Sequence, residues 1–285
     1  MDEGVLDLPD GRKLGYASYG SDDGPPVVYC HGFPSNRLEY QLIEPVVERR
    51  GVDARVVVLD RPGYGKSSFL PKRTLLDWPG DVAAAADHLG LGHFAVVGVS
   101  GGGPYALACG YSLADRVSRV GVVVGVAPRQ ATGMEQAASI DGPSANRLLR
   151  RLQFTMSAYA FKKGQEERFV DQTVATMGDV DREVLNRPEV RQWFTDMTRE
   201  AFIQGGRAAD LEAGLYRRPW GFDLGHVEVE TYLWYGAEDR TVPASAGGWL
   251  AERLPDAEIV VWPQHGHLSW MVADEAADVV GTTKG

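Results

Sequence analysis

The segment that organises the chain reads Phe94-Ala95-Val96-Val97-Gly98-Val99-Ser100-Gly101-Gly102-Gly103-Pro104-Tyr105-Ala106-Leu107-Ala108. Its first six residues are apolar and rich in valine, which is typical of a buried strand, and its last residues open an apolar helical pattern. The chain must therefore reverse sharply, with Ser100 at the apex of the turn. Such a turn closes only if the residues two before and two after the apex have no side chain that would collide, and Gly98 and Gly102 meet that demand. We expect the Ser100 hydroxyl to stand above the strand ends, at a helix N-terminus that favours negative charge.

The same alternation of apolar runs and helical patterns extends over both ends of the chain. It predicts a mostly parallel, doubly wound α/β sheet, because strands that alternate with helices at this spacing form parallel units. An antiparallel hairpin is expected at residues 5–19, strands at 27–30, 56–59, 117–126, 229–235 and 259–262, and helices at 38–50, 81–89, 244–254 and from Ser269 onward.

The alternation stops in the middle of the chain. Between Pro128 and Gly225 the pattern is helical and irregular, with aromatic residues and methionines among many charges. We interpret this part as a helical insertion over the C-terminal edge of the sheet. The predicted domains are a core of residues 1–127 and 225–285 and a helical cap of residues 128–224.

Bulk properties exclude several classes of protein. A chain of 285 residues is long enough for one large α/β domain with an inserted subdomain. Its net charge of -10 argues against a nucleic-acid partner, because binding phosphates needs a basic face. Cys30 and Cys109 lie in apolar patterns and are expected to be small buried hydrophobic residues. No cysteine spacing typical of a metal site occurs, so we expect neither metal nor cofactor.

The N-terminus predicts the location of the protein. Residues 1–4 are acidic and lack the basic and then apolar order of a signal peptide, and no apolar window approaches the length of a membrane span. We therefore expect a cytoplasmic protein without a membrane partner. The sequence leaves the oligomeric state open.

Two polar residues follow late predicted strands and complement Ser100. A serine is a poor nucleophile at neutral pH unless an imidazole takes its proton, and that imidazole needs an acid to orient it. Asp239 and His267 each follow a strand whose end meets the same sheet edge. His265 and Glu238 are the neighbouring alternatives to them.

Other polar residues have simpler interpretations. A His265-x-His267 pair supplies only two metal ligands, and no nearby pattern completes such a site. His31 is expected to brace its own loop. The remaining carboxylates and histidines are expected to be surface, capping or structural residues: Asp210, Asp223, Asp256, His88, His93 and His226.

Residues 60–67 contain Gly-x-Gly-Lys-Ser, which invites comparison with a phosphate-binding loop. The first glycine of that motif is replaced by Arg61, and the next helix begins too late. We therefore interpret the segment as a turn beside the candidate site.

Four segments in this order give the chain its resemblance to a known family: His31-Gly32-Phe33-Pro34, residues 60–67, residues 98–102, and the pair of Asp239 with Gly266-His267. The chain resembles the α/β-hydrolase fold proteins of the lipase, esterase and peptidase superfamily, in which the order is Ser, Asp, His. The resemblance implies an α/β-hydrolase fold with a helical cap.

The resemblance also implies roles for individual residues. Ser100 would be the nucleophile, His267 the general base and acid, and Asp239 the orienting acid. The backbone N–H groups of Phe33 and Gly101 would form the oxyanion hole. A Gly-His pair directly before the last helix favours His267 over His265.

We expect a serine hydrolase that cleaves a carboxylic ester of a small to medium hydrophobic molecule through an acyl-enzyme. Serine stands where epoxide hydrolases and haloalkane dehalogenases of this superfamily carry aspartate, and Gly101 replaces a tryptophan found in some proline iminopeptidases. Other reactions that use the same triad stay open: C–C bond hydrolysis, lyase, acyl-transfer or cyclisation reactions and aminopeptidase activity. A ligand receptor built on the same fold is a further alternative. The candidate substrate-binding residues are Phe33, Tyr105, Met156, Trp193 and Trp220.

Overall fold

A single mixed sheet forms the centre of the computed structural model, which describes residues 1–134 and 146–284. Within these residues the sheet has eight strands in the order β1-β2-β4-β3-β5-β6-β7-β8. Strands β1 and β2 form the antiparallel hairpin that the sequence predicts, and β3 to β8 run parallel. The bounds are β1 Asp2–Asp7, β2 Lys13–Gly20, β3 Pro26–Cys30, β4 Arg55–Leu59, β5 Phe94–Val99, β6 Val117–Val123, β7 Thr231–Gly236 and β8 Ala257–Trp262. The predicted α/β-hydrolase fold is confirmed.

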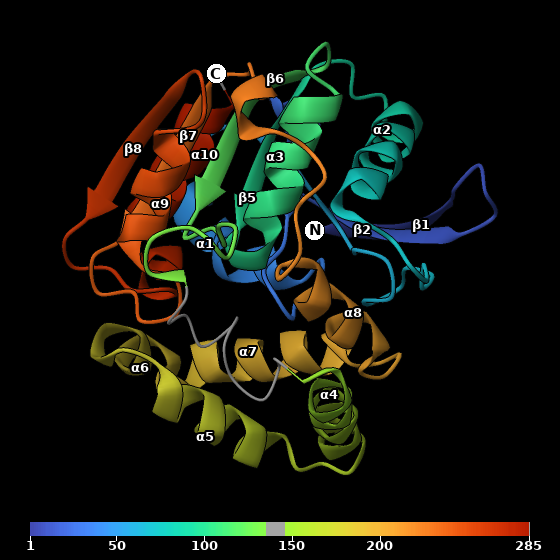
Figure 1. The fold of residues 1–285 in the computed structure, drawn as a ribbon, viewed down its shortest axis with the longest axis vertical. Coiled ribbons are helices and arrows are strands. Elements are labelled where there is room, and N and C mark those ends of the chain that lie inside the picture. Colours follow the sequence, from blue (N-terminus) through green and yellow to red (C-terminus); the bar gives the residue numbers. More distant parts are fainter. Residues whose placement is uncertain (135–145, 285) are drawn as a thin grey trace.

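Helices cover both faces of the parallel strands (Figure 1). In β4, Val57 and Leu59 pack toward α2 and α3, whereas Val56 and Val58 pack toward α1 and α10. Because both faces are buried, the inner strands are continuous apolar runs rather than alternating ones. The bounds are α1 Glu44–Arg49, α2 Trp78–Leu89, α3 Gly103–Ser112, α9 Ala244–Ala251 and α10 Glu275–Thr283.

Five further helices in the described residues lie together across the end of the sheet at which β5 stops (Figure 1). They are α4 Arg147–Lys162, α5 Glu166–Thr176, α6 Asp179–Leu185, α7 Pro188–Ala201 and α8 Arg207–Leu215. A small apolar core joins α4, α8 and the residue that directly follows α7, and it contains Phe154, Ala158, Phe161, Phe202, Ala209 and Ala213. We call α4 to α8 the cap helices. They fall within the predicted insertion, of which residues 135–145 lie outside the described residues.

Several elements have other bounds than the sequence predicts. The strand expected at 117–126 ends at Val123, because Val124 has a left-handed φ of 44° that turns the chain out of the sheet. Two predicted helices are each divided into a 3-10 segment and an α-helix: η1 (Glu39–Leu42) before α1, and η7 (Ser269–Val272) before α10.

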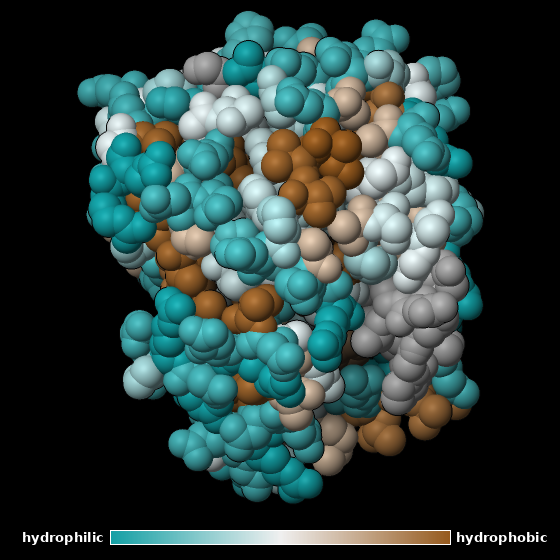
Figure 2. Space-filling view, turned by 90° about the vertical axis from the view of Figure 1, so that its left-hand side faces the viewer, coloured by the Kyte–Doolittle hydropathy of each residue, from teal (hydrophilic) through white to brown (hydrophobic). Residues whose placement is uncertain are grey.

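The side of the molecule that carries β8 is largely hydrophilic, with apolar areas separated by polar residues (Figure 2). Strand β8 is an edge of the sheet, and its Val260 and Val261 are exposed. In the described residues, no helix has the length and apolar character needed to cross a membrane.

Candidate active site

Ser100 lies at the sharp turn between β5 and α3 and has a left-handed φ of 52°. A residue with a Cβ adopts this conformation only at a cost on the order of 1–3 kcal/mol, which the surrounding structure must offset. A Cβ at position 98 would collide with the carbonyl of Gly102, and one at position 102 would collide with the carbonyl of Cys30. The two glycines are therefore required by the close packing of the turn, as the sequence predicts.

His267 and Asp239 approach Ser100 from the loops that follow β8 and β7. The Nε2 atom of His267 lies 2.9 Å from Ser100 Oγ, and its Nδ1 atom lies 2.7 Å from Asp239 Oδ2. The other carboxylate oxygen of Asp239 accepts hydrogen bonds from the amides of Thr241 and Val242 at 2.7 and 2.9 Å. These bonds fix the carboxylate, which in turn fixes the orientation of the imidazole ring.

The environment of His267 changes its proton affinity. Burial lowers the pKa of His267, but the charge and hydrogen bond of Asp239 outweigh burial and raise this pKa above its usual value, with Asp181 and Glu39 contributing further negative charge. An imidazole in this setting is a stronger base toward the serine proton.

The neighbouring alternatives do not join this arrangement. His265 faces Glu275, with 3.2 Å between Nε2 and the carboxylate, and Glu238 is exposed. The structure thus brings together Ser100, Asp239 and His267 and leaves the two alternatives outside.

Phe33 and Gly101 lie in contact at the same sheet edge. A Cβ built on Gly101 would lie 2.6 Å from Phe33 Cβ, so the two segments are in close contact. In the described part of the chain, neither amide donates a hydrogen bond to another group. Two free N–H donors beside the serine match the requirement of an oxyanion hole.

Buried charged side chains shape the loop that carries Phe33. The carboxylate of Glu39 accepts two hydrogen bonds from the Gly32 amide, at 2.9 and 2.8 Å. The guanidinium of Arg61 donates to the carbonyls of His31 and Gly32. Glu39 thus binds the amide of this loop and Arg61 binds its carbonyls. The Phe33 amide takes no part in these contacts.

His31 is a structural residue of this loop, as predicted. It is fully buried, its Nε2 accepts the Arg61 amide at 3.1 Å, and its Nδ1 lies 2.9 Å from the Gly32 carbonyl. Burial, with the positive charge of Arg61, holds the pKa of His31 well below its usual value. His31 is therefore neutral, which is the form that these two hydrogen bonds require.

A buried ionic network that the sequence motifs did not indicate links the cap to the core. Glu212 of α8 has no exposed surface and accepts hydrogen bonds from Arg61 at 2.7 Å, from Arg73 at 3.1 Å and from the Tyr64 hydroxyl at 2.8 Å. Just beyond α8, the Tyr216 hydroxyl donates to the carbonyl of Gly101 at 2.9 Å. The end of α8 is thereby joined to the turn that carries Ser100.

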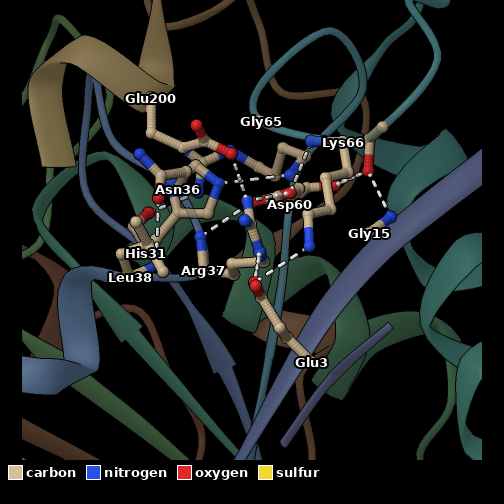
Figure 3. Close-up of polar contacts among 12 residues, drawn as sticks. Glu3, Gly15, His31, Asn36, Arg37, Leu38, Asp60, Gly65, Lys66 and Glu200 are labelled. Atoms are coloured by element: carbon tan, nitrogen blue, oxygen red, sulfur yellow. Dashed lines mark hydrogen bonds and ion pairs between the residues drawn. The ribbon is translucent and has the colours of Figure 1, made fainter. Parts of the chain in front are cut away.

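The segment 60–67 folds around a carboxylate of its own. Asp60 is fully buried and accepts hydrogen bonds from the amides of Arg37 and Lys66 at 2.7 and 2.8 Å (Figure 3). A Cβ at Gly65 would collide with the same carboxylate. Within the Gly-x-Gly-Lys-Ser pattern, Gly65 and Lys66 thus contact a carboxylate of the same segment.

Arg37 extends this network to the cap. Its guanidinium bonds Asp60 at 3.1 Å, Glu200 of α7 at 2.7 Å and Glu3 of β1 at 2.7 Å (Figure 3). One buried arginine thus joins the segment after β4, strand β1 and a cap helix.

A cavity of about 760 Å³ lies between the cap helices and the sheet, a volume in the usual range for a small-molecule site. Ser100 and His267 line it, together with the loop at 32–35 and side chains of α4, α5 and α7. Most of the lining is apolar or aromatic. Arg168, Arg240 and the buried Glu39 are the charged exceptions in the described residues, apart from His267.

The predicted substrate-binding residues divide into two groups. Phe33, Met156 and Trp193 line the cavity. The prediction is wrong for Tyr105 and Trp220. Tyr105 is fully buried beneath the guanidinium groups of the ionic network, and Trp220 borders a separate, smaller hollow. Both belong to the core around α3, which an aromatic residue in a sequence does not reveal.

The residues that the sequence predicts to be surface, capping or structural residues are absent from the cavity lining. Asp210 pairs with Arg150, Asp223 caps η6 (Leu224–His226), and Asp256, His88, His93 and His226 are exposed. Residues 1–134 and 146–284 contain no group of three or more His, Cys, Asp or Glu side chains that could hold a metal ion.

Comparisons with known proteins bear on the fold and the family of the chain. A model of the alpha/beta hydrolase family matches residues 27–282. The chain is 29% identical over 254 residues to a pimeloyl-[acyl-carrier protein] methyl ester esterase of Chromobacterium violaceum, covering 87% of this chain and 89% of that protein. It is 26% identical over 273 residues to the dihydrolipoyllysine-residue acetyltransferase component of the acetoin cleaving system of Pseudomonas putida. That match covers 93% of this chain, which spans 64% of the length of that relative.

A solved structure shows the same fold. A thermophilic esterase from Thermogutta terrifontis superposes with a TM-score of 0.71 at 24% identity, over 99% of this chain and 96% of that chain.

Proposed function

The chain belongs to the alpha/beta hydrolase family, and from this premise we propose that it is a serine hydrolase that cleaves a carboxylic ester through an acyl-enzyme. The observation that carries the proposal is the contact of 2.9 Å between Ser100 Oγ and His267 Nε2, with Asp239 at 2.7 Å on the far side of the ring. A serine held in this way can lose its proton to the imidazole as it attacks.

The reaction has two halves. Ser100 Oγ attacks the ester carbonyl carbon while His267 takes the hydroxyl proton, and the amides of Phe33 and Gly101 stabilise the oxyanion. The intermediate collapses when the alcohol leaves with the proton from His267. Water then attacks the acyl-enzyme, gives its proton to His267 and releases the acid, after which Ser100 recovers its proton.

The cavity supports a hydrophobic substrate of small to medium size. Its lining is mainly apolar, and Phe33 and Trp193 contribute aromatic walls to the cavity that Ser100 lines. The name of the relative from Chromobacterium violaceum, a methyl ester esterase, supports an ester as the bond that is cleaved.

The proposal is tested with p-nitrophenyl esters of acyl chains from acetyl to decanoyl. We expect turnover that depends on chain length, and a loss of at least about 10⁴-fold in kcat in Ser100→Ala, since the triad acts as a unit. Ser112→Ala, an exposed serine at the end of α3, is the matched control and should keep wild-type rates. Negligible rates with every ester, or full turnover by Ser100→Ala, would refute the proposal.

A further inference from the structure

One cap side chain contacts the backbone of the catalytic histidine directly. We propose that Asp181 of α6 is a positioning residue for the reaction: it holds the peptide of His267 in place, and its negative charge stabilises the imidazolium that the reaction creates. This inference rests on the proposed function and adds a cap residue to the machinery of the triad. It follows from hydrogen bonds, burial and charge.

The carboxylate of Asp181 accepts hydrogen bonds from three consecutive backbone amides. Its Oδ2 accepts a hydrogen bond from the His267 amide at 2.8 Å, and its Oδ1 accepts from the amides of Leu268 and Ser269 at 2.8 and 3.0 Å. Three N–H donors to one ionised group make a strong and directional contact. The loop that carries His267 is therefore fixed from the cap side.

The charge of Asp181 has no cationic partner in the described part of the chain. The residue is 1% exposed, and its hydrogen bonds all come from uncharged amides. Little water screens a buried carboxylate, so it interacts strongly with any charge that forms nearby. A positive charge that appears on His267 during turnover would be stabilised by this carboxylate.

Gly266 provides an independent sign that the contact is built into the site. A Cβ at position 266 would collide with the Asp181 carboxylate. The glycine before His267 is thus the residue that admits the cap carboxylate to the loop. The short distance to the Asp181 carboxylate explains why position 266 needs a glycine, since Gly266 does not have a left-handed φ.

The charges around His267 come from several elements. Asp239 faces it from the loop after β7, Asp181 from α6 and Glu39 from η1, while Arg168 and Arg240 line the cavity that His267 shares. The three carboxylates raise the pKa of His267 against the effect of burial, which lowers it. Removing one carboxylate therefore shifts protonation of His267 to lower pH.

The test measures how fast a fluorophosphonate probe labels Ser100 between pH 5 and 9, with Asp181→Asn, Asp181→Ser and the wild type. In both variants we expect the plateau rate to fall by about 10-fold or more, comparable to the loss when a hydrogen-bond partner that orients a metal-bound histidine is removed. We also expect the acid limb of the profile to move to lower pH. Glu183→Gln is the matched control, because it removes one negative charge from an exposed position on the same helix.

The outcomes separate the inference from the proposed function. A labelled wild type with an Asp181→Asn profile unchanged in rate and pH would overturn the inference, as would a slower rate with an unmoved acid limb, which marks a purely structural role. If Asp181→Asn does not fold by circular dichroism, Asp181→Ser, whose hydroxyl can still accept one amide, decides by the same criteria. An unlabelled wild type would contradict the proposed function itself, and the inference with it.

Discussion

His267 combines two properties that usually oppose each other, because it is buried and yet its pKa lies above the ordinary value of 6.5. The balance is set by Asp239 first and by more distant carboxylates second. A raised pKa makes the imidazole a better base, but it also means that the ring is protonated up to a higher pH. Activity and the charge state of one residue are therefore tied together.

The protonation of His267 should set the pH dependence of the reaction. Since protonated His267 cannot take the Ser100 proton, kcat/KM should fall as pH drops through a value above 6.5. Asp239→Asn should move this limb to lower pH and reduce kcat on the order of 10³ to 10⁴-fold, because the ring loses its orienting acid. The measurement is the profile of kcat/KM against pH with one ester, and Asp256→Asn, an exposed change of the same kind, is its control. A wild-type limb below 6.5 would contradict the account.

The sequence was sufficient to predict that Ser100, Asp239 and His267 meet at one site, because each follows a strand within a recognisable motif. It was not sufficient for Asp181, Glu39 and Glu212. Asp181 and Glu212 come from cap helices without a motif and reach their partners only through the way the cap packs, whereas Glu39 comes from the short 3-10 helix η1 of the core. Their signal in a sequence is a lone carboxylate on a helix, which in most proteins is a solvated surface residue.

At the level of elements, the cap helices are attached to the core by buried polar contacts as well as by apolar ones. The Asn36 amide donates to the Met197 carbonyl of α7 at 2.6 Å, and the Trp193 indole donates to the Leu38 carbonyl at 3.2 Å. The ion pairs of Glu212 and Glu200 attach α8 and α7. Directional bonds of this kind fix the cap in one position over the cavity.

Glu212→Gln tests the attachment of α8. The change leaves the buried guanidinium groups of Arg61 and Arg73 without their carboxylate, so we expect the free energy of unfolding to fall by about 3–5 kcal/mol. Urea unfolding measures the loss, and Glu189→Gln, an exposed position on α7, is the control. A change within about 0.5 kcal/mol, the range of ordinary surface substitutions, would contradict the role of this network.

The same carboxylate makes a pH-dependent contribution. Burial raises the pKa of Glu212, but the charges of Arg61 and Arg73 outweigh burial and hold it below the usual value of 4.5. Its contribution to stability is therefore present above pH 4.5 and is lost as pH falls toward the folded-state pKa.

Trp193 of α7 tests the substrate wall. Its side chain lines the cavity, so Trp193→Ala should enlarge the space for the acyl chain. We expect the acyl length with the highest kcat/KM to become longer than in the wild type, measured with the same p-nitrophenyl series. Trp249→Ala on α9, outside the cavity lining, should leave the optimum unchanged. An unchanged optimum in Trp193→Ala would show that this wall does not limit the substrate.

The elements themselves could be predicted better than their ends. Buried strands such as β5 are recognisable because both faces are covered and the runs are continuously apolar. Strand β6 ends at Val123 because Val124 has a left-handed φ, and the apolar run at 117–126 does not reveal this conformation. Tyr105 and Trp220 show the same limit, because aromatic periodicity does not distinguish a core from a cavity wall.

At the scale of the molecule, the parallel strands end at one edge of the sheet, and three polar side chains follow strands at that edge. Ser100 follows β5, Asp239 follows β7 and His267 follows β8, so residues far apart in sequence meet where the cap closes a cavity. Ligands in open α/β sheets bind at this carboxyl edge. We therefore propose, as the central claim, that Ser100 is a nucleophile activated by His267.

Covalent labelling tests that claim most directly. The intact protein is treated with a fluorophosphonate probe, and its mass and peptide map are measured for the wild type, Ser100→Ala and His267→Ala. We predict one probe per chain, bound to Ser100, with no label in Ser100→Ala and a labelling rate at least about 10³-fold lower in His267→Ala. Label on another residue, or wild-type labelling in His267→Ala, would contradict it.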